Sequence, residues 1–99
     1  MSRRLEQINE ALKRELGQII LEHLDFGRNV LITVSKVDTA PNLSEAKIYV
    51  SVLPESFSQE VLKSLQNKSF AFHRSINKIM HIRKIPKLFF HEEKAIKEA

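Results

Sequence analysis

The chain has 99 residues, of which 42% are hydrophobic and 28% charged, and its formal net charge is +4. This composition fits one folded domain with a modest core and excludes a disordered chain. The absence of cysteine excludes disulfides and cysteine-based metal sites, and points to a reducing compartment. No apolar run is long enough to span a bilayer, and no apolar stretch follows the first basic residues as in a signal peptide, so we expect a cytoplasmic protein.

The first predicted element is an amphipathic helix of about twenty residues. Its apolar residues recur at steps of three and four, as on one face of a helix. They are Leu5, Ile8, Leu12, Leu16, Ile19, Ile20 and Leu24. Ser2 is a candidate N-cap, and Gly27 can adopt the left-handed conformation that often ends a helix.

Two segments with alternating β-branched residues predict an antiparallel hairpin. The residues expected on its inner face are Val30, Ile32 and Val34 in the first strand and Ala46, Ile48, Val50 and Val52 in the second. Residues 38–45 contain several turn-forming residues and are expected to form the loop. Pro54 ends the second strand because it has no N–H to donate to a sheet.

A bent helical region is predicted next. Ser56 and Gln59 match a capping box, which would start a helix. The apolar stripe then lapses at Ser69, and its members are Val61, Leu62 and Leu65 before the lapse and Phe72, Ile76 and Ile79 after it. We expect a bend there, from which each of two helices sends one phenylalanine inward. Helical structure ends before Pro86, and residues 87–90 are expected to form a third strand.

Charge is distributed unevenly along the chain. Residues 1–60 carry seven Lys or Arg and nine Asp or Glu, whereas residues 61–91 carry seven Lys or Arg and no acid. Solvated surfaces usually mix both signs, so this acid-free run favours contact with nucleic acid. An acidic protein, a membrane surface or no partner at all are the alternatives that the residues leave open.

Two strings resemble the bacterial ribosome-binding factor A family. They are ITVSKVDTAPNLSEAKIYVSVL, residues 32–53, and HRSINKIMHIRKIPKLFF, residues 73–90. The resemblance implies an α+β fold of the KH-like type II variant, in the order α-β-β-α-kink-α-β, with a three-stranded sheet packed against helices. We expect a single domain over residues 1–91 and a polar tail over residues 92–99.

The family resemblance also concerns the bend between the two helices. In place of the GxxG loop of other KH modules, the family has an Ala-x-Gly kink. The corresponding positions here are Lys68, Ser69 and Phe70, so neither the alanine nor the glycine is present. The aspartate of the family's hairpin loop is Asn42 in this chain, and both residues favour turns.

By this resemblance the chain is expected to be a non-enzymatic, RNA-binding factor of ribosome biogenesis. It would bind the free small (30S) ribosomal subunit, assist late maturation and processing of 16S rRNA, and act in cold shock and cold adaptation. We expect a monomer without cofactor, small-molecule substrate or membrane partner. The alternative is a basic adaptor that docks on an acidic protein, for which Phe70 is the one spare apolar anchor.

The expected site combines cations and one histidine. The predicted RNA-binding residues are Lys68, His73, Arg74, Lys78, Arg83, Lys84 and Lys87. Taken singly, each cation is as compatible with a bland interpretation as with RNA contact. In the bland interpretation its side chain is solvated or has a carboxylate partner from residues 1–60. Phe70 either plugs the bend or stacks on a base, while Tyr49, Phe89 and Phe90 are expected in the core. The histidine spacing and the absence of a recognisable triad or phosphate loop predict no metal or catalytic site.

Overall fold

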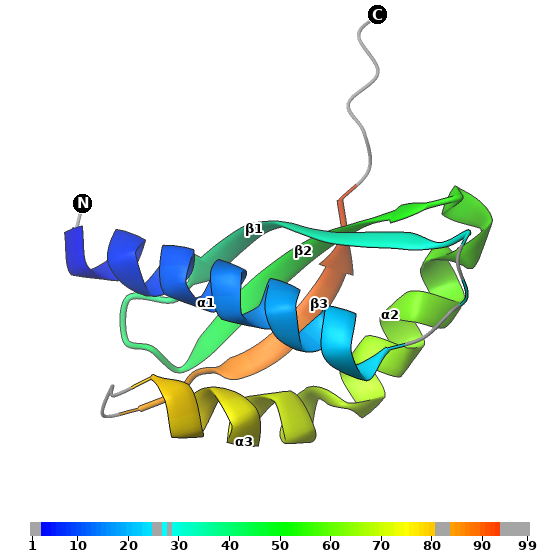
Figure 1. The fold of residues 1–99 in the computed structure, drawn as a ribbon. Helices are drawn as coiled ribbons and strands as arrows, with labels where there is room; N and C mark the ends of the chain where they lie inside the picture. Colours follow the sequence, from blue (N-terminus) through cyan, green and yellow to red (C-terminus); the bar gives the residue numbers. More distant parts are fainter. Residues whose placement is uncertain (1–2, 25–26, 28, 81–83, 94–99) are drawn as a thin grey trace, which may run out of the picture.

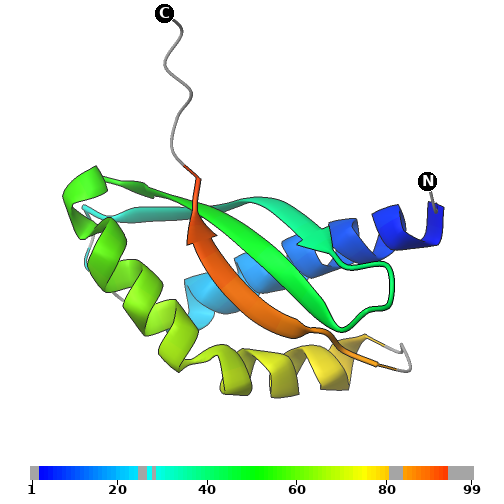
Figure 2. The ribbon, with the colours of Figure 1, turned by 180° about the vertical axis from the view of Figure 1, so that it is seen from behind.

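The fold is described from a computed structural model, for residues 3–24, 27, 29–80 and 84–93. Its elements, in chain order, are α1 (Arg3–His23), β1 (Leu31–Thr39), β2 (Glu45–Leu53), a 3-10 turn (Glu55–Phe57), α2 (Ser58–Asn67), α3 (Ser69–Ile79) and β3 (Lys87–Glu92). Helices α1 and α3 lie along one face of the sheet, and α2 slopes across its end (Figure 1). The view from behind shows the other face without a helix across it (Figure 2).

The three strands form one mixed sheet in the order β1-β2-β3. β1 and β2 pair antiparallel from Leu31 opposite Leu53 to Thr39 opposite Ala46, which confirms the predicted hairpin. β3 pairs parallel to β2. A parallel pair needs a long connection, and α2 and α3 provide it by returning the chain to the end of the sheet where β2 begins. The predicted α+β fold with a three-stranded sheet is therefore confirmed, and β3 extends two residues beyond its expected end, to Glu92.

The first strand departs from simple alternation. A β-bulge between Val34 and Lys36 inserts an extra residue opposite β2 and shifts the inward face. Val34 is buried as predicted, and the next inward residues are Val37 and Thr39. Ile32 is half-buried and Val30 lies just before the strand, and both pack against the core on the side of Val34, as predicted. The prediction did not extend past the bulge.

The core lies between the helices and the inner face of the sheet. The middle of the predicted α1 stripe is buried, at Ile8, Leu12, Leu16, Ile19 and Ile20, as is the whole predicted β2 face, at Ala46, Ile48, Val50 and Val52. Leu5 and Leu24, at the two ends of the stripe, are half-buried. Gly27 has a φ of 93°, the left-handed conformation expected of it. The proposed N-cap Ser2 lies outside the described residues.

The start of α2 differs from the predicted capping box. Ser56 lies in the 3-10 turn, and α2 begins at Ser58, with Phe57 as an N-cap that makes no side-chain hydrogen bond. Ser58 is buried, and its hydroxyl donates to a carboxylate oxygen of Glu92 at 2.7 Å. This contact between α2 and the end of β3 is a tertiary one, which a local sequence motif does not encode.

The bend is present, but it lies before both phenylalanines and does not separate them. Lys68, with φ −97° and ψ 5°, separates α2 from α3. Phe70 and Phe72 therefore both belong to α3, where a two-residue step turns the side chain by about 200°. Phe72 is buried and Phe70 is 72% exposed, so the expectation that Phe70 points inward is wrong. Ile79, the last residue of α3, is 47% exposed and leaves the stripe as well.

The aromatic residues of the strands divide between the two faces of the sheet. Phe90 is buried and packs edge-to-face against Phe72, with ring centroids 5.9 Å apart. Phe89 is 41% exposed on the opposite face. Tyr49 is half-buried, and its ring contacts His91 and lies beneath the Lys36 ammonium group. Of the three expected core aromatics, only Phe90 is in the core.

Candidate nucleic-acid interface

The exposed face of α3 carries the centre of the predicted site. Phe72 and Ile76 anchor the opposite face in the core, so the residues that remain outside are fixed by helical geometry. Arg74 and Lys78 are both exposed and, four residues apart, lie on one face of the helix. Phe70 precedes Arg74 by four residues and belongs to the same exposed stripe. We call these three residues the α3 stripe.

Lys68 adds a cation at the junction of the two helices. Its side chain is exposed, and its backbone forms the cap between α2 and α3. No side chain caps the amino terminus of α3, which carries the positive end of the helix dipole, and its first turn holds no acid. A lysine at this end does not stabilise the helix, whereas a bound anion would stabilise both the lysine and the helix end.

Among the described residues, no ion pair neutralises these cations. In the described part of the chain, the one ion pair joins Arg14 to Glu15 at 3.4 Å, on α1. None of the five described lysines and arginines of the predicted site has a carboxylate within 4.0 Å among those residues; they are Lys68, Arg74, Lys78, Lys84 and Lys87. A carboxylate partner from residues 1–60 was an open alternative for each, and the described residues supply none.

His73 has a partner within the protein. Its Nε2 lies 2.9 Å from the carbonyl oxygen of Ile85, in the segment that leads into β3. A carbonyl only accepts, so Nε2 carries the proton and donates, and Nδ1 is left as an acceptor in the neutral ring. The half-buried ring thus holds α3 against the segment before β3, a positioning role that the sequence did not indicate.

A hollow opens beside the bend, between α3 and β3. We call it the kink hollow, and its lining residues are Gln66, Ser69, Phe70, His73, Lys87, Leu88 and Phe89. Gln66, one of these residues, pairs with the edge of β3. Its amide nitrogen donates to the Leu88 carbonyl at 3.2 Å, and its amide oxygen accepts from the Phe90 N–H at 3.0 Å. Neither Phe89 nor Gln66 was predicted to belong to the site, because no local pattern marks either.

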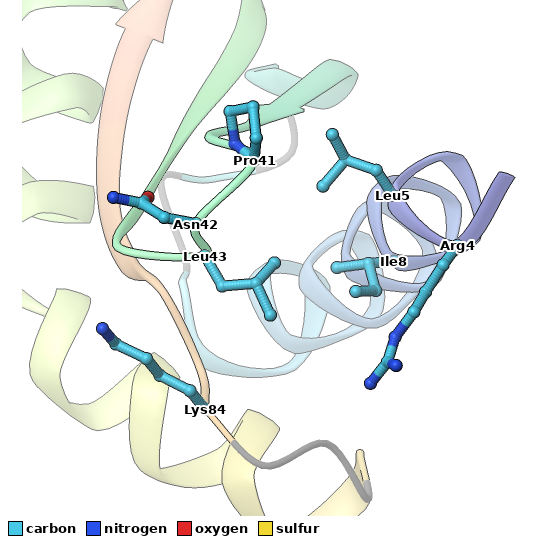
Figure 3. A pocket seen from close by; sticks show the side chains of 7 residues that line it. All are labelled: Arg4, Leu5, Ile8, Pro41, Asn42, Leu43 and Lys84. Carbon is cyan, nitrogen blue, oxygen red and sulfur yellow. The ribbon is translucent and has the colours of Figure 1, made fainter. Parts of the chain in front are cut away.

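Lys84 lies elsewhere, at a second hollow formed by α1, the β1–β2 loop and the segment before β3. Its lining residues are Arg4, Leu5, Ile8, Pro41, Asn42, Leu43 and Lys84. Figure 3 shows Arg4 on one side and Lys84 on the other, with the apolar side chains between them. The acid-free run is therefore divided between two places, and Arg4, from the mixed-sign half, joins the second. Arg83 lies outside the described residues.

The described residues contain no group of three or more histidines, aspartates or glutamates placed to hold a metal ion. Within the same residues, no helix is both long and apolar enough to cross a membrane. The features that stand out are thus the exposed cations and the two aromatic rings at the kink hollow.

Comparison with known proteins assigns the family. The sequence profile of ribosome-binding factor A matches residues 4–99. The chain belongs to the ribosome-binding factor A family. A relative from Christiangramia forsetii that bears this name is 36% identical over 97 residues, which cover 94% of this chain and 74% of the relative.

Solved structures of the family share the fold. The crystal structure of ribosome-binding factor A from Thermus thermophilus superposes with a TM-score of 0.79 at 23% identity, covering 89% of this chain and 93% of that one. A homology model of the Thermus thermophilus factor, fitted into a cryo-EM map of its complex with the 30S subunit, gives a TM-score of 0.70 at 24% identity, covering 84% and 88%. The KH-like α+β fold agrees with both.

Proposed function

We propose that this protein is a non-enzymatic assembly factor that binds the free 30S ribosomal subunit through 16S rRNA. We also propose that the protein assists late maturation of that RNA and has a role in cold adaptation. It would act as a monomer in the cytoplasm, where small subunits are assembled. Residues 1–91 form the RNA-binding unit in this proposal, and the polar residues 92–99 follow it. Membership of the family and the 30S complex of the Thermus thermophilus relative support it.

The observation that carries the proposal is the α3 stripe with Lys68 beside it. These cations are exposed, and no carboxylate of the described residues lies within ion-pair distance of them. A cation that has no ion-pair partner can bind an anion without first losing such a pair. RNA supplies a regular row of phosphates. Lys87, at the start of β3, extends the positive surface from α3 to the sheet edge.

One observation favours a second candidate, an adaptor that docks on an acidic protein. Such docking needs an exposed apolar anchor, and Phe70 is exposed beside two cations. Protein-free 16S rRNA separates the two candidates, because an adaptor would not bind it.

The experiment is co-sedimentation with free 30S subunits, with assembled ribosomes as the comparison, together with binding to protein-free 16S rRNA. Replacing Arg74 and Lys78 by glutamate should weaken binding to both RNA-containing ligands at least tenfold, about 1.4 kcal/mol. The matched control replaces Arg3 and Arg14 by glutamate, which makes the same charge change at exposed positions of α1. Equal losses from the two double variants would mean that net charge alone drives binding, and the α3 stripe would not be the site.

A further inference from the structure

The kink hollow contains two exposed aromatic rings on separate elements. Phe70 comes from the first turn of α3 and Phe89 from the outward face of β3, and both line the same hollow. An exposed phenylalanine gains nothing for the fold, and two at one hollow form an apolar surface that is available to a ligand. The hollow has a volume of about 460 Å³, within the range of small-molecule sites.

Hydrogen bonds from side chains to backbone groups hold the walls of the hollow together. Gln66 pairs with two backbone groups of β3 and so holds that strand against the end of α2. His73 donates to Ile85 and holds α3 against the segment before β3. The rings of Phe70 and Phe89 are therefore presented from two walls that are tied together. Such preorganisation lowers the entropy lost when a ligand is bound.

The rim of the hollow is positive. Lys87 lines it, Arg74 follows Phe70 by one helical turn, and Lys68 lies two residues before Phe70. No acid is among the lining residues. The hollow thus pairs aromatic faces with cations, and an unpaired nucleotide combines the matching base and phosphate.

We propose that the kink hollow binds an unpaired RNA base, stacked on Phe70 and Phe89, with the adjoining phosphates on Lys87 and Arg74. This inference rests on the proposed function and specifies its substrate as single-stranded RNA. A base inside a duplex is already stacked and cannot enter the hollow, whereas an unpaired base is free to do so. The Ser69 hydroxyl and His73, which line the same hollow, are the groups available to contact a base edge.

An apolar side chain of another protein is the competing occupant. It would use the two rings but would leave the cations of the rim without a phosphate. The RNA base accounts for both features, so it is the occupant we propose, and the experiment below decides between them.

The test measures binding of single-stranded RNA of about 12 nucleotides, a length near the site size of single-strand binders, and of the same sequence as a duplex, by fluorescence anisotropy. Phe70→Leu keeps apolar bulk and removes the aromatic face, and should weaken single-strand binding at least fivefold, about 1 kcal/mol. Phe70→Tyr keeps the ring and should stay within about twofold of the unchanged chain. Duplex binding should be the same for all three proteins.

Two further measurements complete the test. A strand with 2-aminopurine in place of one purine should lose fluorescence on binding the unchanged chain and much less on binding Phe70→Leu, because stacking quenches this base. Leu21→Ala is the control, since Leu21 is 71% exposed on α1, away from the hollow. It should leave RNA binding and quenching unchanged.

The outcomes separate this inference from the proposed function. If Phe70→Leu binds single strands as tightly as the unchanged chain while Arg74→Glu with Lys78→Glu binds weakly, the RNA interface stands and the base site is wrong. A protein side chain would then be the better occupant of the hollow. If the unchanged chain binds neither single-stranded nor duplex RNA, both the inference and the proposed function are overturned.

Discussion

Helices α1 and α3 lie on the same face of the sheet but present different surfaces to solvent (Figure 1). The exposed side of α1 mixes both signs, with Glu6 and Glu10 among its arginines and an ion pair between Arg14 and Glu15. The exposed side of α3 holds two cations and a phenylalanine, and α3 contains no acid. Amphipathic packing thus explains both buried faces, and the two exposed faces differ in that α1 carries acids beside its cations whereas α3 carries none.

The largest expected effect concerns the two phenylalanines of α3, which lie on opposite sides of one helix. Phe72→Ala should lower the free energy of unfolding by about 3–5 kcal/mol, because it empties a fully packed position. Phe70→Ala should change it by less than about 0.5 kcal/mol. Urea unfolding followed by circular dichroism measures both, and a larger loss at Phe70 would contradict the assignment of the buried and ligand-facing sides.

Gln66 tests how firmly the second half of the chain is joined to the sheet. Gln66→Ala removes both hydrogen bonds to the edge of β3 and leaves the Leu88 carbonyl and the Phe90 N–H without this partner. We expect a loss of about 1–3 kcal/mol of stability in the same unfolding assay. Gln59→Ala, at an exposed position of the same helix, should cost less than about 0.5 kcal/mol. Equal effects would show that the bridge contributes nothing specific.

The salt dependence of RNA binding sharpens the contrast between the exposed faces. With three to six phosphate contacts, the slope of log K against log salt should be roughly −2 to −5. Replacing Arg74 and Lys78 by glutamate should make that slope shallower by about 1.4–1.8, the share of two phosphates. Replacing Arg3 and Arg14 should leave it unchanged. A slope that is equally shallow in both double variants would place the phosphate contacts outside α3.

The smallest effect is expected at the ion pair of α1. Glu15→Ala removes the carboxylate that Arg14 contacts, with 71% of the arginine side chain exposed. Exposed pairs of this kind contribute about 0–1 kcal/mol to stability, and salt screens them. Thermal unfolding at low and high salt measures the change. A much larger loss would mean that the mixed-sign face of α1 is a structural feature in its own right.

The regular spacing of apolar residues predicted which face of a helix or strand is buried wherever that spacing is uninterrupted. The α1 stripe and the inner face of β2 are buried as expected, because each alternates or repeats without interruption. The inward residues of β1 after Val34 were not predicted, because the bulge there changes the register and brings Val37 and Thr39 inward, and a bulge depends on the partner strand. At the start of α2 the predicted cap, Ser56, lies in a 3-10 turn, and the first residue of the helix, Ser58, bonds to Glu92, which lies 34 residues away.

The candidate site shows the same division between local and tertiary information. The acid-free run identified the cations of α3, since net charge is a property of the sequence. The run did not show that Lys84 belongs to a different hollow with Arg4, nor that Gln66 and Phe89 join Phe70 and His73. The first grouping arises where the segment before β3 lies near α1 and the β1–β2 loop, and the second where β3 runs beside the bend.

Residue types at short, regular spacing were sufficient to predict the amphipathic helices, the hairpin, the existence of a bend and the family. The tertiary structure alone decided that Lys68 is the bend residue and that Phe70 therefore faces solvent. It also decided that Phe70 and Phe89 share one hollow. A bend placed three residues later, at Ala71, would put Phe70 and Phe72 on different helices. The direction of each ring thus depends on how the two helices pack on the sheet, which no local pattern contains.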